Sequence, residues 1–173
     1  MNTEITVKSE KIFEGKIVNL RVDTVELQNK KYAKREIVEH KSAVCVLAVN
    51  KDKLLLVRQY RKAIEEFLYE LPAGILNIAE EPQEGALREL EEETGYRAES
   101  IKLLYEFYTS PGFSNEKVYL FEAYELIFKA VNFDEDECIE TIEVTKEEAK
   151  KMLQTGRITD SKTLIGLMHW LYS

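Results

Sequence analysis

The first forty residues alternate between apolar and polar side chains, which is the pattern of β-strands with one buried face. Within residues 17–27, apolar side chains at alternate positions share one face until the alternation changes phase at Val25. A change of phase in a strand indicates a bulge, with an extra residue on one side of the pairing. We therefore expect β structure with a bulge or bend in this N-terminal segment.

A more apolar region follows and predicts the centre of a sheet. Residues 43–48 and 53–60 are expected to form two strands of a hairpin, and the apolar run 54–57 is typical of a strand buried on both faces. A short strand at 68–71 is followed by the Pro72-Ala73-Gly74 sequence, where proline and glycine predict a change of direction.

The apolar period changes after residue 80, and a helix is predicted over residues 82–94. Pro82 suits its first turn, and Gly95 suits the position just beyond its end. Further strands are predicted at 101–108, 117–126 and 139–144, followed by helices that open at the N-cap residues Thr145 and Asp160. Strands with helices placed between them predict an α+β fold, built as a layered α/β/α sandwich.

The predicted helix 82–94 has an acidic face and an apolar face. At about 100° per residue, Glu89, Glu92 and Glu93 fall within roughly a third of the circumference. Leu87 and Leu90 project to the opposite side and are expected to pack on the sheet, with the carboxylates directed away from the core. A glutamate run alone is most simply a solvated helix face, but the same arrangement supplies the oxygen ligands that Mg²⁺ prefers.

Charge and cysteine content restrict the possible partners. The 173 residues carry 24 Lys+Arg against 32 Asp+Glu, a net charge of -8, which disfavours a nucleic-acid polymer. A small phosphorylated substrate stays compatible because a bound divalent cation reverses the local field. The two cysteines form no CxxC motif, and no leader or membrane-spanning stretch is recognisable. We therefore expect a cytoplasmic protein without membrane contacts.

Residues 74–96 read GILNIAEEPQEGALRELEEETGY and contain a recognisable spacing of charged residues and glycines. The fixed positions are Gly74, Glu80, Arg88, Glu89, Glu92, Glu93 and Gly95, with a bulky apolar residue after the last. This segment resembles the Nudix box at every fixed position. The resemblance to the Nudix hydrolases implies a Nudix-type α/β/α sandwich with a mixed β-sheet, in which a loop, a helix and a second loop carry the catalytic residues.

The resemblance also implies roles for the box residues. Mg²⁺, or Mn²⁺ in its place, is expected to bind Glu89 and Glu93, with Glu92 close behind and the Ala73 carbonyl as a further ligand. Arg88 is expected to orient a box carboxylate through a charge-assisted hydrogen bond. Arg88 and Glu92 are both expected to be catalytic residues. Such cations neutralise the oxygens of a diphosphate bridge and activate a water molecule.

A proline downstream of the box points to one group within this family. Pro111, followed by Gly112, lies sixteen residues after the box glycine Gly95. A Pro-Gly pair alone most often marks a turn, but at this distance the proline resembles the mark of the ADP-ribose pyrophosphatases. Residues 34–40, 57–61 and 70–74 resemble that group as well. This resemblance implies hydrolysis of ADP-ribose to AMP and ribose 5-phosphate.

Two other functions remain open at this point. The first is hydrolysis of a nucleotide sugar such as GDP-mannose or ADP-glucose, because the box acts on the diphosphate and not on what flanks it. The second is a non-catalytic module that senses a nucleotide, although such a module would be expected to lose box carboxylates that this chain retains.

The catalytic base of the group lies on an acidic loop downstream of the box. Residues 134–137 read Asp-Glu-Asp-Glu and occupy the corresponding place. Glu135 is therefore the expected base, and Glu137 is an additional candidate metal ligand. A solvated acidic loop is the alternative interpretation of the same residues.

Substrate contacts are expected from several parts of the chain. Arg61, at the end of a predicted strand, can pair with a substrate phosphate through its planar fork of donors, or can be an ordinary exposed arginine. The resemblance places Pro111 and Gly112 beside the substrate. It also implies that Arg35 and Glu36 reach a nucleoside across a homodimer, because the N-terminal β segments of the group are exchanged between subunits. Residues 1–41 would be the small antiparallel β subdomain for dimerisation and substrate contacts, and residues 42–173 the Nudix catalytic domain.

Overall fold

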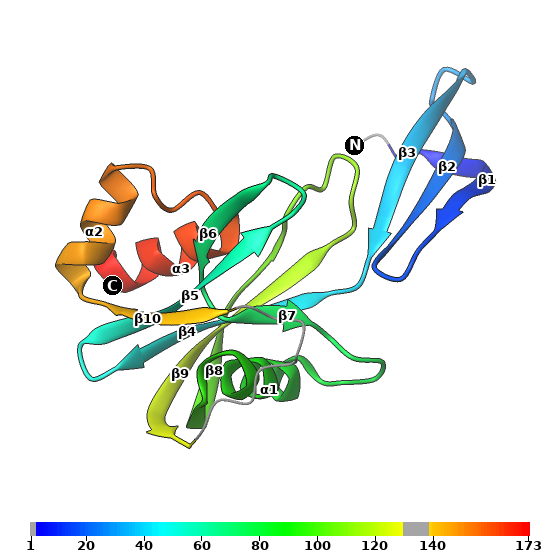
Figure 1. Cartoon of the computed structure of the whole chain (residues 1–173). Coiled ribbons are helices and arrows are strands. Elements are labelled where there is room, and N and C mark those ends of the chain that lie inside the picture. Colours follow the sequence, from blue (N-terminus) through cyan, green and yellow to red (C-terminus); the bar gives the residue numbers. More distant parts are fainter. Residues whose placement is uncertain (1–2, 130–138) are drawn as a thin grey trace. The chain divides into compact units, whose positions relative to one another are not determined.

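The computed structural model in Figure 1 describes residues 3–129 and 139–173. The chain divides into two compact units. One contains residues 1–42 together with 107–117, and the other contains residues 43–106 together with 118–173. Each unit is described by itself.

The first unit is built on a three-stranded antiparallel sheet in the order β1-β2-β3. Its strands are β1 (Ile5–Glu14), β2 (Val18–Glu26) and β3 (Tyr32–His40). The pairing of β2 with β3 is continuous over the whole length of β2. Two register shifts occur instead between β1 and β2, at residues 6–8 and 11–13 of β1. The irregularity predicted within residues 17–27 therefore belongs to the neighbouring strand.

Polar residues on the buried face of β2 explain this difference. Asp23 is 3% exposed and shares that face with the buried Val25, while Arg21 lies 3.4 Å from the Asp23 carboxylate. A buried carboxylate interrupts the apolar alternation without changing the backbone, because Arg21 offsets its charge. The apolar alternation in the sequence therefore changes phase within β2, although the pairing of β2 with β3 has no bulge.

The second unit contains a seven-stranded mixed sheet. Its strands are β4 (Ala43–Asn50), β5 (Lys53–Arg61), β6 (Glu66–Glu70), β7 (Ala73–Ile75), β8 (Tyr96–Tyr108), β9 (Lys117–Phe128) and β10 (Glu140–Val144). The main path runs β10-β5-β4-β9-β8, and β6 and β7 pair with β5 and β4. The β4–β9 pair is parallel, whereas β4–β5, β4–β7, β5–β6 and β5–β10 are antiparallel.

Helices cover both faces of this mixed sheet. They are α1 (Pro82–Thr94), α2 (Lys146–Gln154) and α3 (Ser161–Tyr172). Figure 1 shows α1 on one face and α2 and α3 on the other. The predicted α/β/α sandwich is therefore confirmed. Among the described residues, no helix has the length and apolar character needed to cross a membrane.

The core follows the apolar runs of the central strands. The four residues Leu54–Val57 are fully buried, as expected of a strand covered on both faces. On the α1 side, Val44 and Val46 belong to one buried cluster with Ala86 and Leu90 of the helix. Burial of this apolar stripe fixes the rotation of α1 and so determines where its charged side chains lie.

Strand β7 differs from the change of direction predicted at Pro72-Ala73-Gly74. Ala73 and Gly74 lie opposite Cys45 and Val44 of β4 in an antiparallel pair. The amide of Val46 also donates to the carbonyl of Pro72 over 2.9 Å. The proline and glycine therefore sit on an edge of the sheet, and this brings a backbone strand directly alongside α1.

Candidate active site

Helix α1 ends where its sequence predicted. Gly95 adopts the left-handed conformation, with φ of 73°, and its amide donates to the carbonyl of Glu91 over 2.9 Å. This conformation suits glycine because a side chain there would be strained. The helix packs against β4 and β7, so its charged face lies beside the Ala73–Ile75 backbone.

The Arg88 guanidinium joins three carboxylates. It donates to both oxygens of Glu80 over 2.8 and 3.0 Å, to Glu89 over 2.7 Å and to Glu92 over 2.9 Å. It also donates to the carbonyl of Ile75 over 3.3 Å. We call Arg88 and these three glutamates the Arg88 cluster. Only a planar fork of donors can serve so many acceptors at once, so a lysine would not replace this arginine.

The Arg88 cluster favours the ionised form of Glu80. The hydrogen bond from Arg88, opposed by desolvation and reinforced by the Asn77 amide, lowers the pKa of Glu80 to about 2. In turn the hydrogen bond that Arg88 donates to Glu80, followed by contacts with Glu89 and Glu92, raises the pKa of Arg88. Glu80 therefore acts as an anchor for the arginine, which in turn fixes the carboxylates of Glu89 and Glu92.

Glycine at position 74 makes room for Glu89. A Cβ atom built on Gly74 would lie 2.0–2.2 Å from the carboxyl atoms of Glu89. The Glu89 side chain is 12% exposed because its carboxyl group lies against the backbone of β7. The Gly74 and Glu89 positions of the box are thus related by direct packing.

Burial of the box carboxylates differs from the expectation that all three point away from the core. Glu92 is 54% exposed and agrees with it, whereas Glu93 is only 6% exposed. One Glu93 oxygen accepts the amide hydrogen of Ala73 over 2.9 Å. Because β7 lies against α1, the part of the acidic face nearest this strand is covered.

The donor set of these residues suits a hard divalent cation. Glu89, Glu92, Glu93 and the Ala73 carbonyl offer oxygen atoms only, which is the ligand chemistry of Mg²⁺ and Mn²⁺. In residues 3–129 and 139–173, no group of three acidic, histidine or cysteine side chains is close enough to enclose a cation. The carboxylates of Glu89 and Glu92 are bonded to Arg88, and that of Glu93 is bonded to the Ala73 amide.

Arg61 lies in a second charged group that the sequence reasoning missed. Its Nε and Nη2 donate to the two oxygens of the buried Glu70 over 2.6 and 2.8 Å. Lys162 of α3 also donates to Glu70, and it contacts Asp160 over 3.0 Å. Arg61 is therefore paired with a buried carboxylate, and its side chain is 41% exposed to solvent.

The charges of this group stabilise one another. Burial disfavours ionised Glu70, but the hydrogen bond from Arg61 and the charge of Lys162 hold its pKa below the ordinary value. Burial likewise opposes the charge on Lys162, whereas Asp160 and Glu70 raise its pKa. A glutamate at the end of the apolar 67–71 segment was the only signal of this group in the sequence, because Lys162 lies 92 residues away.

The remaining described candidates belong to the first compact unit. Arg35 is bonded to Glu4 through two of its nitrogens and to the carbonyl of Lys34 over 3.0 Å, and Glu36 is exposed. The hydrogen bond that Arg35 donates to the Glu4 carboxylate raises the pKa of Arg35. The geometry leaves the expected nucleoside contacts of Arg35 and Glu36 untested.

Pro111 and Gly112 are exposed and lie in a turn. The amides of Phe113 and Ser114 donate to the carbonyl of Ser110 over 3.1 and 2.9 Å. A Cβ atom on Gly112 would meet nothing within 4 Å, so packing does not explain glycine at this position. The predicted base Glu135 and the predicted ligand Glu137 lie outside the described residues.

Comparison with known families assigns the box helix and the mixed sheet to one family of hydrolases. The NUDIX domain model matches residues 39–164, and residues 4–38 match the nucleoside diphosphate sugar hydrolase N-terminal domain. The chain therefore belongs to the Nudix hydrolase family, as its box predicted.

Individual relatives narrow the comparison further. The chain is 47% identical to the ADP-ribose pyrophosphatase of Bacillus subtilis (strain 168), and 48% identical to the methanol dehydrogenase activator of Bacillus methanolicus. Each alignment covers 96% of this chain and 91% of the relative. A crystal structure of an ADP compounds hydrolase has the same fold, with a TM-score of 0.87 and 20% identity over 97% of this chain and 94% of that one.

Proposed function

We propose that this protein hydrolyses the diphosphate linkage of ADP-ribose, releasing AMP and ribose 5-phosphate, with Mg²⁺ as its cation. The observation that carries the proposal is the complete box, folded so that Arg88 holds Glu89 and Glu92 beside β7. The 47% identity with an ADP-ribose pyrophosphatase over nearly the whole chain supports the choice of substrate.

The residues that would hold Mg²⁺ are Glu89 and Glu93, with Glu92, the Ala73 carbonyl and Glu137 as additional ligands. When bound, the cation neutralises diphosphate oxygens and lowers the pKa of a water molecule, and Mn²⁺ can take its place. Because Arg88 and the Ala73 amide already bond to these carboxylates, binding requires them to reorient or to share their second lone pairs. Arg88 limits how far Glu89 and Glu92 can move.

Proton transfer and substrate binding are assigned to residues outside the Arg88 cluster. Glu135 would accept the proton of the attacking water. Arg61 would bind a substrate phosphate through the part of its guanidinium that Glu70 does not use, since the Glu70 bonds involve Nε and Nη2. The pairing with Glu70 would hold the guanidinium in one orientation before substrate arrives.

We further propose that residues 1–41 form the dimerisation subdomain and contribute Arg35 and Glu36 to the substrate site of a cytoplasmic homodimer. Pro111 and Gly112 would contact the same substrate from their turn. Strand β1 supports the dimer, because its apolar side chains are exposed in the single chain. Examples are Ile5, Ile12 and Phe13, each more than half exposed.

A substrate panel tests the proposed reaction and its specificity together. Purified protein with Mg²⁺ is assayed against ADP-ribose, GDP-mannose and ADP-glucose, and the products are identified by chromatography. We expect ADP-ribose to have the highest kcat/KM and to give AMP and ribose 5-phosphate. The competing choice is a nucleotide sugar, which the match of residues 4–38 supports. It would be preferred if a sugar nucleotide were hydrolysed equally well or faster.

Two variants separate an enzyme from a nucleotide-sensing module. Glu92→Gln and Glu93→Gln keep the size of each side chain but remove its charge, so we expect Mg²⁺-dependent turnover to fall by about 100-fold or more. Circular dichroism serves as the control for folding. A sensing module would bind nucleotide without turnover in the wild type, and unchanged rates in both variants would refute the assigned metal ligands.

A further inference from the structure

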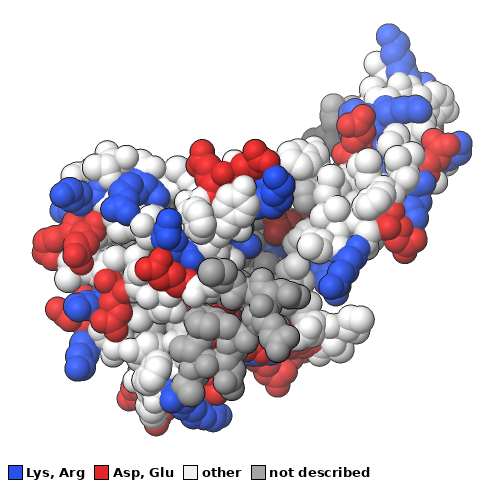
Figure 2. All heavy atoms as spheres, in the orientation of Figure 1, with Lys and Arg blue, Asp and Glu red and all other residues white. Residues whose placement is uncertain are grey.

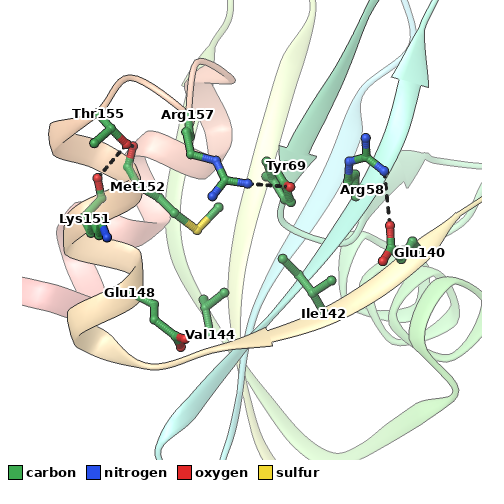
Figure 3. A pocket seen from close by; sticks show the side chains of 10 residues that line it. All are labelled: Arg58, Tyr69, Glu140, Ile142, Val144, Glu148, Lys151, Met152, Thr155 and Arg157. Atoms are coloured by element: carbon green, nitrogen blue, oxygen red, sulfur yellow. Dashed lines mark hydrogen bonds and ion pairs between the residues drawn. The ribbon is translucent and has the colours of Figure 1, made fainter.

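A cavity lies in the larger unit, between α2 and strands β5, β6 and β10. Its volume is about 580 Å³, within the range of small-molecule sites. Figure 3 shows that its lining side chains come from β5, β6, β10, α2 and the segment just after α2. None of these side chains belongs to the Arg88 cluster or to the Arg61–Glu70 pair.

Two guanidinium groups meet at one aromatic ring in this cavity. Arg157 lies 4.9 Å from the centre of the Tyr69 ring and donates to the Tyr69 hydroxyl over 2.7 Å. Arg58 lies 5.9 Å from the same ring centre and 4.4 Å from that of Phe67. Tyr69 therefore holds Arg157 in place by two contacts. Figure 3 shows Tyr69 between Arg157 and Arg58.

The acids of the cavity neutralise these cations incompletely. Glu140 contacts Arg58 over 3.3 Å, and Glu148 is engaged in the capping box of α2, where it accepts from Thr145. Within the part of the chain that the structure describes, neither Arg157 nor Lys151 has a carboxylate within 4.0 Å of its side-chain nitrogens. The cavity lining thus carries three cationic side chains against two carboxylates, in a chain whose net charge is -8.

The wall opposite these cations is apolar. Val144 and Met152 are buried and Ile142 is partly buried. Figure 3 shows Ile142 and Met152 projecting into the space below Arg157. On the face shown in Figure 2, Lys and Arg side chains at the end of this unit that carries α2 are interspersed with Asp and Glu side chains. A ligand with an anionic head and a flat or apolar body would satisfy both walls at once.

We propose that this cavity is a second binding site, for a small phosphate monoester. The dianionic phosphate balances the charges of Arg157 and Lys151, and the organic part packs on Ile142 and Met152. Tyr69 completes the site by fixing Arg157. This inference goes beyond the proposed hydrolysis and does not depend on it, because it uses no residue of the candidate active site.

The test is a titration of the ¹⁵N-labelled full-length protein with phenyl phosphate, in EDTA and at constant ionic strength. EDTA removes divalent cations, so binding through the box carboxylates is suppressed. We expect saturable shifts of the amides of residues 140–157 and no comparable shifts in residues 74–95. Binding that perturbs only residues 74–95, or shifts that do not saturate, would overturn the proposal.

Matched variants test the chemistry of the site. Arg157→Gln and Tyr69→Phe should each weaken phenyl phosphate binding, the former by about tenfold or more because a charge-assisted contact is lost. Lys150→Gln removes an equal charge from α2 at a position that does not line the cavity, and it should leave the affinity within twofold. Equal losses in the Arg157 and Lys150 variants would indicate general charge attraction and refute the site.

A second ligand distinguishes a phosphate site from a general anion site. Benzoate has a similar ring but a single negative charge, so it should bind at least tenfold more weakly than phenyl phosphate. Equal affinities for the two would contradict the assignment to phosphate monoesters. Turnover of ADP-ribose by Arg157→Gln, measured without phenyl phosphate, should match that of the wild type. The proposed phosphate binding and the proposed hydrolysis can therefore be refuted independently of each other.

Discussion

At the residue scale, Arg88 and Gly74 determine where the box carboxylates lie. Arg88 supplies the bonds and Gly74 supplies the space, and both act on Glu89. The sequence placed these residues together because they occupy fixed positions of one box, in a helix and the short strand before it. It did not show that Glu93 would be buried, because that depends on β7 lying against the helix.

Gly74→Ala should impair catalysis without unfolding the protein. The new methyl group would overlap the Glu89 carboxyl group, which is the flexible end of a side chain and can move aside. We expect Mg²⁺-dependent turnover of ADP-ribose to fall on the order of 10- to 100-fold through this displacement. The free energy of unfolding, measured with urea, should change by less than about 1 kcal/mol. Normal turnover would show that the position of Glu89 is not critical.

Glu80 should make the stability of the protein depend on pH. Its pKa falls from 4.5 to about 2 on folding, so the ionised side chain stabilises the native state above pH 4.5. This contribution should shrink as the pH falls from 4.5 toward 2. We expect the difference in unfolding free energy between the wild type and Glu80→Gln to follow the same course in urea titrations. A difference that stays constant across this range would contradict the lowered pKa.

At the element scale, α3 is attached to the turn between β6 and β7 by one buried threonine. The Thr163 hydroxyl accepts the amide hydrogen of Leu71 over 2.8 Å and donates to Asp160 over 2.6 Å. Asp160 also accepts from the Thr163 amide and so caps the helix. The same helix carries Lys162, so this attachment supports the position of Glu70 and, through it, of Arg61.

Thr163→Val should therefore be more damaging than its small change in shape suggests. It leaves the buried Leu71 amide without its acceptor, at a cost of about 1–3 kcal/mol. Thr163→Ser is the matched control, since it keeps the hydroxyl and loses only a methyl group, at about 1 kcal/mol. Chemical denaturation of the wild type and the two variants measures the order of their unfolding free energies. If the serine variant were the less stable, packing rather than hydrogen bonding would be the main role of Thr163.

Element boundaries were predictable wherever a local signal marked them. Helices α2 and α3 begin after Thr145 and Asp160, whose side chains accept the amide hydrogens of Glu148 and Thr163. Strand β7 was not predictable, because three residues after a proline have no periodicity of their own. The Arg61–Glu70–Lys162 contacts were missed for a related reason: pairing across 92 residues leaves no local pattern.

At the scale of the whole molecule, we expect a homodimer through the N-terminal unit. Light scattering after gel filtration should give about twice the chain mass of 20.1 kDa. Phe13→Lys places a charge on an exposed apolar position of β1 and should shift the protein toward monomers. Met168→Lys is the control, because Met168 is similarly exposed but lies on α3. Loss of the dimer in both variants, or in neither, would argue against an interface at β1.

The insertion of residues 107–117 into the first unit has a consequence for cutting the protein apart. These residues bond to β3, where the Val38 amide donates to the Phe113 carbonyl over 2.8 Å and the His40 amide donates to Asn115 over 2.8 Å. The backbone therefore passes from one unit to the other at three places, after residues 42, 106 and 117. Cleavage by a protease at residue 42 alone would leave both fragments associated. A shortened gene encoding residues 43–173 would instead leave residues 107–117 without β3, their hydrogen-bonding partner.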